Sequence, residues 1–114
     1  MKVQEIASLL SARALCDEEL LNMEAVDVFC CDMMSDVLAY ATNQSVLITG
    51  LLNPQVVRTA MMQDMRCIIF VCGKQPTPEI VSLAKENGIA ILVTEYHMFK
   101  AAGILYSTGK LNGD

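Results

Sequence analysis

Polar residues that could bind or transform a small molecule follow four short apolar runs in this chain. They fall into four groups along the sequence: Asp32 and Ser35; Thr49, Gly50 and Asn53; Cys72, Gly73 and Lys74; Thr94 and His97. Where a glycine turn leads into a helix, free backbone N–H groups and the helix dipole favour an anion, and a nearby lysine adds positive charge. The residue types and their order therefore predict a ligand-binding site for a phosphate or another anion.

The same segments also fit a simpler interpretation. Strand-glycine-helix turns occur in many α/β domains only to reverse the chain, and Asp32 and Ser35 suit the N-cap and first turn of a helix. The sequence contains neither a Gly-x-x-x-x-Gly-Lys-Ser/Thr run nor a Gly-x-Gly-x-x-Gly run. A phosphate-binding loop of the NTPase type and a dinucleotide fingerprint are therefore not indicated. We expect neither phosphoryl transfer nor a bound cofactor.

A catalytic alternative uses Cys72 as nucleophile and His97 as base, with a carboxylate that orients the histidine. Asp32 and Glu95 are the candidates for this carboxylate, because both follow strands whose carboxyl ends should converge. No local nucleophile motif surrounds Cys72. A single histidine before Met98 is more typical of a helix start or a surface position. We therefore expect no catalytic residues, and a small cysteine-dependent enzyme is the less favoured alternative.

The cysteines predict reduced thiols and not a metal site. They are Cys16, Cys30, Cys31, Cys67 and Cys72, an odd number without a Cys-x-x-Cys pair. Neighbouring residues of a strand point to opposite faces, so Cys30 and Cys31 could not share a metal ion. The apolar neighbours of the cysteines favour buried thiols that act as small hydrophobic side chains. No metal ligands are expected.

The elements that must position these residues alternate between strand and helix from residue 25 onward. Nearly continuous apolar runs predict strands over 26–31, 45–49, 67–72 and 90–94, because strands covered on both faces are apolar throughout. Helical spacing and turn signals predict helices over 33–42, 54–63, 78–87 and 97–106. This alternation indicates βαβ units. The predicted fold is α/β with three layers, in which helices cover both faces of a small, mostly parallel sheet of four to five strands.

Two helix starts have a clear local signal. Asn53–Pro54 and Thr77–Pro78 each place a side-chain acceptor at the N-cap and a proline at the first helical position. Gly88 can take the left-handed conformation that ends the second of these helices. The N-terminal part is predicted to form, in order, an amphipathic helix over 3–11, a short strand over 13–16 and an exposed acidic turn at 17–19.

Length and composition predict a single domain over residues 1–114. Hydrophobic residues make up 54% and charged residues 18%, which is too apolar for disorder. The net charge of -5 and eight scattered basic residues argue against binding nucleic acid through its backbone. No apolar run is long enough to cross a bilayer, and Glu5 interrupts the region where a signal peptide would be apolar. We expect a cytoplasmic protein without a membrane partner.

The apolar composition also predicts a partner protein. Few charges are available to cover the surface of a monomer, and eight methionines include the pairs Met33–Met34 and Met61–Met62. Methionine suits adaptable packing and apolar contact surfaces. A homodimer is the expected assembly.

The order of elements and three stretches of sequence resemble the DRTGG domain family. The stretches are Phe29-Cys30-Cys31-Asp32-Met33-Met34-Ser35-Asp36-Val37-Leu38, residues 46–50 and residues 69–73, within a resemblance that covers most of the chain. Similar domains occur in some phosphotransacetylases and, beside CBS domains, in some pyrophosphatases, and a related fold forms the N-terminal domain of HPr kinase/phosphorylase. The resemblance implies a three-layer α/β fold, a regulatory or ligand-sensing role and a tendency to dimerise.

Matched position by position, the Asp-Arg letters of this family fall near Leu51 and Leu52, and the Thr-Gly-Gly letters fall on Val71, Cys72 and Gly73. Only Gly73 matches. The resulting expectation is a non-catalytic regulatory module that acts as a homodimer. It would bind a protein partner or a small ligand, with an adenine nucleotide or another anion as the candidate. The alternatives are a structural subunit of a larger complex and the cysteine enzyme described above.

Overall fold

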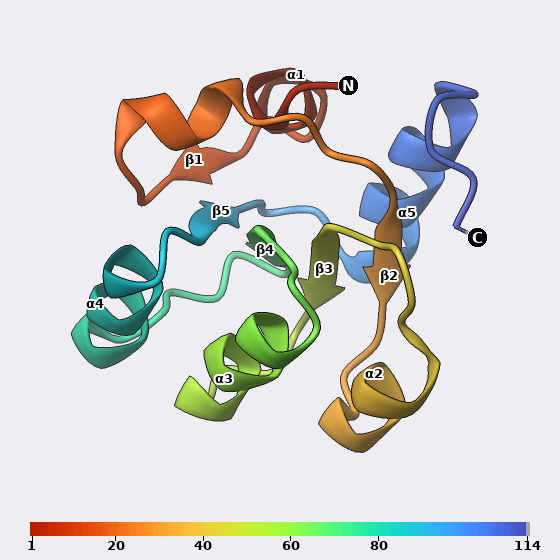
Figure 1. Cartoon of the computed structure of the whole chain (residues 1–114). Helices are drawn as coiled ribbons and strands as arrows, with labels where there is room; N and C mark the ends of the chain where they lie inside the picture. Colours follow the sequence, from red (N-terminus) through yellow and green to blue (C-terminus); the bar gives the residue numbers. More distant parts are fainter. Residues whose placement is uncertain (114) are drawn as a thin grey trace.

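The computed structural model describes residues 1–113, which form one sheet with helices on both faces (Figure 1). The elements are, in chain order, α1 (Val3–Leu9), β1 (Arg13–Ala14), the 3₁₀ helix η1 (Glu18–Asn22), β2 (Val28–Cys30), α2 (Met34–Tyr40), β3 (Val46–Thr49), α3 (Pro54–Met62), β4 (Cys67–Phe70), α4 (Pro78–Glu86), β5 (Ala90–Val93) and α5 (Met98–Ser107). The predicted α/β class is confirmed. The predicted acidic turn is the start of η1.

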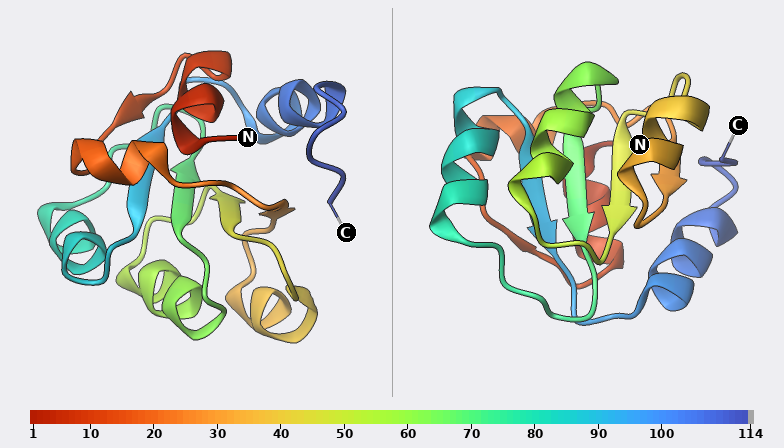
Figure 2. Two further views of the ribbon diagram at one scale, coloured as in Figure 1. Left: turned by 45° about the horizontal axis from the view of Figure 1, so that its top comes forward. Right: turned by 90° about the horizontal axis from the view of Figure 1, so that it is seen from below.

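The sheet has five strands in the order β1-β5-β4-β3-β2. Strands β2, β3, β4 and β5 are mutually parallel, and β1 pairs antiparallel with β5. The parallel register places Thr49, at the end of β3, beside Phe70, at the end of β4. The right-hand view of Figure 2 shows the arrowheads of β3, β4 and β5 pointing the same way. The loops that leave these strands therefore meet at one edge.

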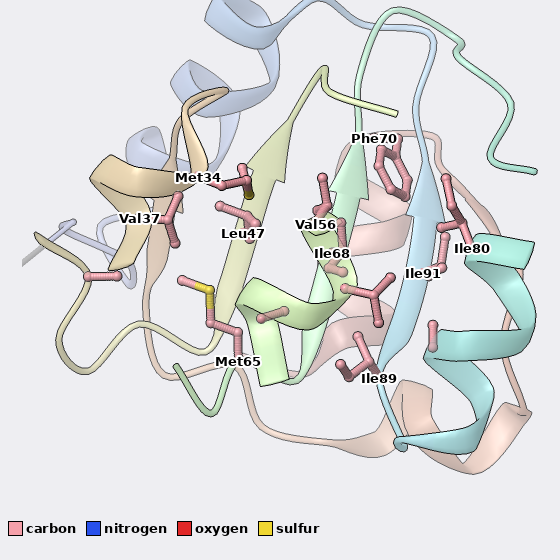
Figure 3. Packing of buried hydrophobic residues seen from close by; sticks show 14 of the residues in the cluster. Met34, Val37, Leu47, Val56, Met65, Ile68, Phe70, Ile80, Ile89 and Ile91 are labelled. Carbon is pink, nitrogen blue, oxygen red and sulfur yellow. The ribbon is translucent and has the colours of Figure 1, made fainter. Parts of the chain in front are cut away.

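The two faces of the sheet are covered by different helices. Helices α2, α3 and α4 cover one face, and α1, η1 and α5 cover the other (Figure 2). Alternate residues of the central strands enter the two layers, so Leu47, Ile68 and Ile91 pack under α2, α3 and α4 (Figure 3). Every residue of β3, β4 and β5 is buried, as the continuous apolar runs predict.

The local capping signals are confirmed. The Asn53 side chain accepts a hydrogen bond from the Gln55 N–H at 2.9 Å, and the Thr77 hydroxyl accepts one from the Ile80 N–H at 3.3 Å. Gly88 has a φ of 65° and directly follows Asn87, the C-cap of α4. Among residues 1–113, no helix has the length and apolar character that crossing a bilayer requires.

The prediction that the cysteines are buried is correct only for Cys67. Cys30 and Cys72 are exposed, and Cys16 and Cys31 are half-buried. Cys30 lies on β2, which is the last strand of the sheet and has a neighbour on one side only. The predicted strand over 67–72 ends at Phe70 because Cys72, with a φ of 64°, belongs to a turn. Edge position and a turn, neither visible in the apolar pattern, expose these thiols.

One buried hydroxyl should reduce stability. Thr59 on α3 is fully buried, and its Oγ1 has no hydrogen-bond partner within residues 1–113. Replacing Thr59 with valine keeps the shape and removes the desolvated hydroxyl, so we expect the free energy of unfolding to rise by about 1 kcal/mol. In thermal denaturation this gain corresponds to a midpoint higher by roughly 4–8 °C.

Thr94→Val is the contrasting control. Thr94 is equally buried, but its hydroxyl donates to the Leu10 carbonyl at 2.7 Å and accepts from the Tyr96 N–H at 3.2 Å. Valine at this position should lower the melting temperature. A loss of stability at both positions would show that the Thr59 hydroxyl has a partner in solution.

Candidate ligand site at the carboxyl edge of the sheet

Three loops meet at the backbone of Gly50, just beyond the end of β3. Asp32, from the β2–α2 loop, accepts hydrogen bonds at its Oδ1 from the Gly50 N–H at 2.7 Å and from the Thr49 hydroxyl at 3.0 Å. Lys74, from the β4–α4 loop, donates from its Nζ to the Gly50 carbonyl at 2.6 Å. Four of the predicted site residues thus form one hydrogen-bonded cluster.

This cluster corrects the predicted role of Asp32. The N-cap of α2 is Met33, and no side chain caps this helix. The carboxylate of Asp32 instead reaches across to the end of the neighbouring strand, where it accepts from a backbone N–H and a buried hydroxyl. Ser35 does lie in the first turn of α2, as expected, and is exposed. The Gly50 N–H therefore already donates its hydrogen bond to a carboxylate of the chain itself.

The loops after β4 and β5 form a second connected group. The Cys72 N–H donates to the Tyr96 carbonyl at 2.9 Å, and the Gly73 N–H donates to the Thr94 carbonyl at 2.8 Å. The amides of both predicted loop glycines, Gly50 and Gly73, thus have partners within the chain. An anion at this edge would have to bind side chains such as Lys74, or other amides of these loops.

Thr49 and Thr94 have matching roles at the ends of β3 and β5. Each is fully buried, and each hydroxyl accepts from the N–H two residues further along, at 3.2 Å, from Leu51 and Tyr96 respectively. This local bond fixes the direction in which the chain leaves the strand. Both threonines therefore shape the loops from within, and neither presents its hydroxyl to solvent.

The structure does not assemble the catalytic alternative. Cys72 and His97 are both exposed, and no hydrogen bond joins them in the described part of the chain. His97 is the N-cap residue of α5 and makes no side-chain capping bond, which fits the helix-start position considered for it. Asn53, likewise, serves as the cap of α3.

The family follows from a match over nearly the whole chain. The model of the DRTGG domain family matches residues 5–108. This chain belongs to the DRTGG domain family. No curated protein matches the sequence of this DRTGG domain.

A solved structure with CBS and DRTGG domains has the same fold. It is the regulatory region of Clostridium perfringens pyrophosphatase in complex with its activator, diadenosine tetraphosphate, and it aligns with a TM-score of 0.76 at 23% sequence identity. The alignment covers 91% of this chain and 45% of that one. Our DRTGG domain thus spans less than half the length of that regulatory region.

The turn after β4 gives a physical reason for paired glycines at this position. Cys72 and Gly73 have φ values of 64° and 65°, and the Lys74 N–H lies 3.4 Å from the Val71 carbonyl, as in a type I′ turn. Both central positions of such a turn favour glycine. In this DRTGG domain Cys72 occupies the first of them, a conformation that costs a non-glycine residue about 1–2 kcal/mol.

Sequence reasoning missed a hollow on the β1 side of the edge. It has a volume of about 190 Å³ and is lined by Ser11, Arg13, Gly73, Gln75, Val93 and Glu95. The Arg13 guanidinium donates to the Gln75 side-chain oxygen, and the Glu95 carboxylate lies over Gly73. The short strand over 13–16 was predicted, but no local signal showed that it would lie beside β5.

Cys16 and Cys67 are poor nucleophiles. Burial raises the pKa of the Cys67 thiol well above its usual range and also raises that of Cys16, because desolvation disfavours the thiolate. Within residues 1–113, no group of three or more His, Cys, Asp or Glu side chains is arranged to hold a metal ion. What this edge offers a ligand is hydrogen bonding to charged side chains of both signs, such as Lys74 and Glu95.

Proposed function

We propose that this DRTGG domain is a non-catalytic regulatory module that binds a small ligand at the carboxyl edge of its sheet and acts as a homodimer. An adenine nucleotide is the first candidate ligand. Membership of the DRTGG family supports the regulatory role, and the fold it shares with a nucleotide-activated regulatory region supports the candidate. A cytoplasmic location belongs to the proposal and agrees with five unpaired cysteines.

The observation that carries the proposal is the Lys74 ammonium on the Gly50 carbonyl. A lysine ammonium has three N–H donors, and this bond uses one of them. A phosphate group could take the others without opening the cluster, or could draw Lys74 away and separate two loops. In either case, ligand binding would change the positions of the β3–α3 and β4–α4 loops, and a partner could detect that change.

The size and charge of the edge limit what can bind. The hollow beside Gly73 holds about 190 Å³, whereas sites for whole drug-sized ligands hold roughly 300–1,000 Å³. It therefore suits a phosphate or a base, with the remainder of a nucleotide lying over the loops. Arg13 and Lys74 are balanced by Asp32 and Glu95, so binding would depend on directed hydrogen bonds more than on net charge.

We expect ligands to raise the melting temperature of the wild type, and we expect this rise to depend on Lys74 and not on other lysines. ATP, ADP, AMP, diadenosine tetraphosphate and inorganic phosphate are each added, and the melting temperature is measured. A ligand at about one hundred times its Kd should stabilise the native state by roughly 2.7 kcal/mol. In Lys74→Gln the ligand-induced shift should fall to less than half.

Lys85→Gln is the matched control, because Lys85 is exposed on α4, away from the edge, and should retain the full shift. Each shift is compared with the same variant without ligand, so a change in basal stability cancels. A panel in which no compound raises the melting temperature of the wild type would contradict the ligand part of the proposal.

A further inference from the structure

The edge of β2 that faces away from β3 is partly free to accept another strand. The segment after α5 lies against its beginning, where the Gly113 N–H donates to the Asp27 carboxylate at 2.9 Å, whereas Cys30 at its end is exposed. Within residues 1–113, β2 pairs with β3 only. The Val46 N–H donates to the Asp27 carbonyl, and the Cys31 N–H donates to the Ile48 carbonyl. Backbone groups alternate in direction along a strand, so Val28 and Cys30 direct theirs away from β3. The Val28 N–H is taken by the Asp27 side chain, which leaves Cys30 as the residue able to pair through both N–H and C=O.

An apolar hollow lies beside this edge, between β2 and α5. It has a volume of about 330 Å³. Val28 and Cys30 of β2, Phe99 and Tyr106 of α5, and Leu111 and Gly113 of the segment after α5 are among the residues that line it. Phe99 is 92% exposed, an unusual state for a phenylalanine on a helix that has a buried face. In Figure 1, α5 and α2 lie on opposite sides of β2 at the outer end of the sheet.

The flank of α2 at this end of the sheet is apolar as well. Met33 is the N-cap of α2 and Tyr40 is its last residue; being seven positions apart, they begin and end the same side of the helix. Met34 and Val37 pack into the core, while Leu38 lies toward α3, since its carbonyl accepts from Gln63. Tyr40 therefore lies on the side of α2 that faces away from α3, toward the β2 end of the sheet, and both Tyr40 and Met33 are exposed.

We propose that a second copy of this chain binds here, with the two β2 edges antiparallel about a twofold axis close to Cys30. The proposal assigns a surface to the homodimer of the proposed function and rests on it. The two sheets become continuous, the α5 helices meet on one face, and the α2 helices meet on the other. Cys30 of each copy then lies opposite Cys30 of the other.

The exposed area of this surface is close to what a stable dimer needs. Met33, Tyr40, Phe99 and Tyr106 are between 59% and 92% exposed. At about 150–250 Å² for a complete aromatic side chain, and less for Met, they present roughly 500 Å² of mostly apolar surface. A standard interface buries about 800 Å² on each partner, and the groups between these four side chains can supply the difference.

The charge of the chain also fits a self-association that depends on apolar contacts. All four of these side chains are uncharged, whereas the whole chain carries -5, so two copies repel each other at long range. Added salt screens that repulsion. The dimer should therefore become stronger as salt is raised, unlike a complex held by opposite charges.

Light scattering after size exclusion tests the surface. At micromolar concentration the wild type should have twice the chain mass of 12.5 kDa, and Phe99→Glu should have the mass of one chain. Met62→Glu is the control. Met62 is 64% exposed on α3, so this substitution adds the same charge at a surface away from β2, and the variant should remain dimeric. Circular dichroism confirms that each variant is folded.

Crosslinking through the natural cysteines tests the pairing itself. A short bis-maleimide should join two wild-type chains through Cys30, and Cys30→Ser should abolish the product. Cys72→Ser, which removes the other exposed cysteine, should leave it intact. Desolvation raises the pKa of the Cys30 thiol to about 11, so only a small fraction is thiolate in mildly alkaline buffer. The reaction is therefore continued for as long as a mono-maleimide needs to label Cys30 completely.

The outcomes separate this surface from the proposed function. A wild-type dimer that persists in Phe99→Glu and gives no Cys30 product would overturn the surface and leave the homodimer standing. A monomeric wild type would overturn both, while the nucleotide panel would still decide the ligand part of the function.

Discussion

Replacing Gly73 with valine is expected to lower the free energy of unfolding by roughly 2 kcal/mol, because a β-branched side chain is strongly disfavoured at positive φ. Gly73 has a φ of 65°, and an added Cβ would overlap the Glu95 carboxylate. The substitution therefore strains the turn and displaces a residue that lines the hollow. Chemical denaturation of the wild type and the variant measures the loss.

Two controls divide this loss into its parts. Gly88 also has a φ of 65°, but no atom lies within 4 Å of the place where its Cβ would be, so Gly88→Val measures the backbone strain alone. Cys72→Gly should have the opposite sign, because it relieves the strained first position of the same turn. Equal losses at Gly73 and Gly88 would mean that Glu95 moves aside without cost.

Asp32→Ala is expected to lower the free energy of unfolding by about 1–2 kcal/mol, since hydrogen bonds to a charged group contribute roughly 1.5–3 kcal/mol and Asp32 is partly screened by solvent. The Thr49 hydroxyl is fully buried and would lose its acceptor, and the Gly50 N–H would lose its partner. Thermal denaturation should show a midpoint lower by several degrees.

Asp32→Asn tests the geometry separately from the charge. The amide oxygen of asparagine can still accept both hydrogen bonds, so this variant should recover more than half of the stability lost in the alanine variant. Asp17→Ala is the control, because the Asp17 side chain makes no capping bond at the start of η1 and its removal should change little. A loss at Asp17 as large as that at Asp32 would contradict the role assigned to the Gly50 cluster.

The sequence was most informative where the decisive interaction is local. Asn53 and Thr77 bond to N–H groups two and three residues away, so their roles could be recognised from neighbouring letters. The parallel strands were equally visible, because burial on both faces leaves continuous apolar runs. These two signals were sufficient for the fold class and for the edge at which the loops meet.

The candidate site was less predictable because its contacts join distant segments. Asp32 looked like an N-cap because its actual partners, Thr49 and Gly50, lie at the end of the next strand and directly after it. Arg13 reaches the hollow only through the pairing of β1 with β5. Cys72 continued an apolar run and looked like strand, whereas the backbone of the turn decides its exposure. The errors at Asp32 and Arg13 thus concern tertiary contacts, and the error at Cys72 concerns the backbone of a turn.

The antiparallel strand β1 has a consequence for how the chain folds. Its two residues pair with Val93 and Leu92, and the nearby bond from Thr94 to Leu10 joins residues 84 positions apart. The βαβ units between these ends need only short-range contacts, whereas β1 must wait until β5 has been synthesised. We therefore expect the N-terminal segment to dock on the sheet only after β5 has been synthesised, when contacts of long sequence separation can first form.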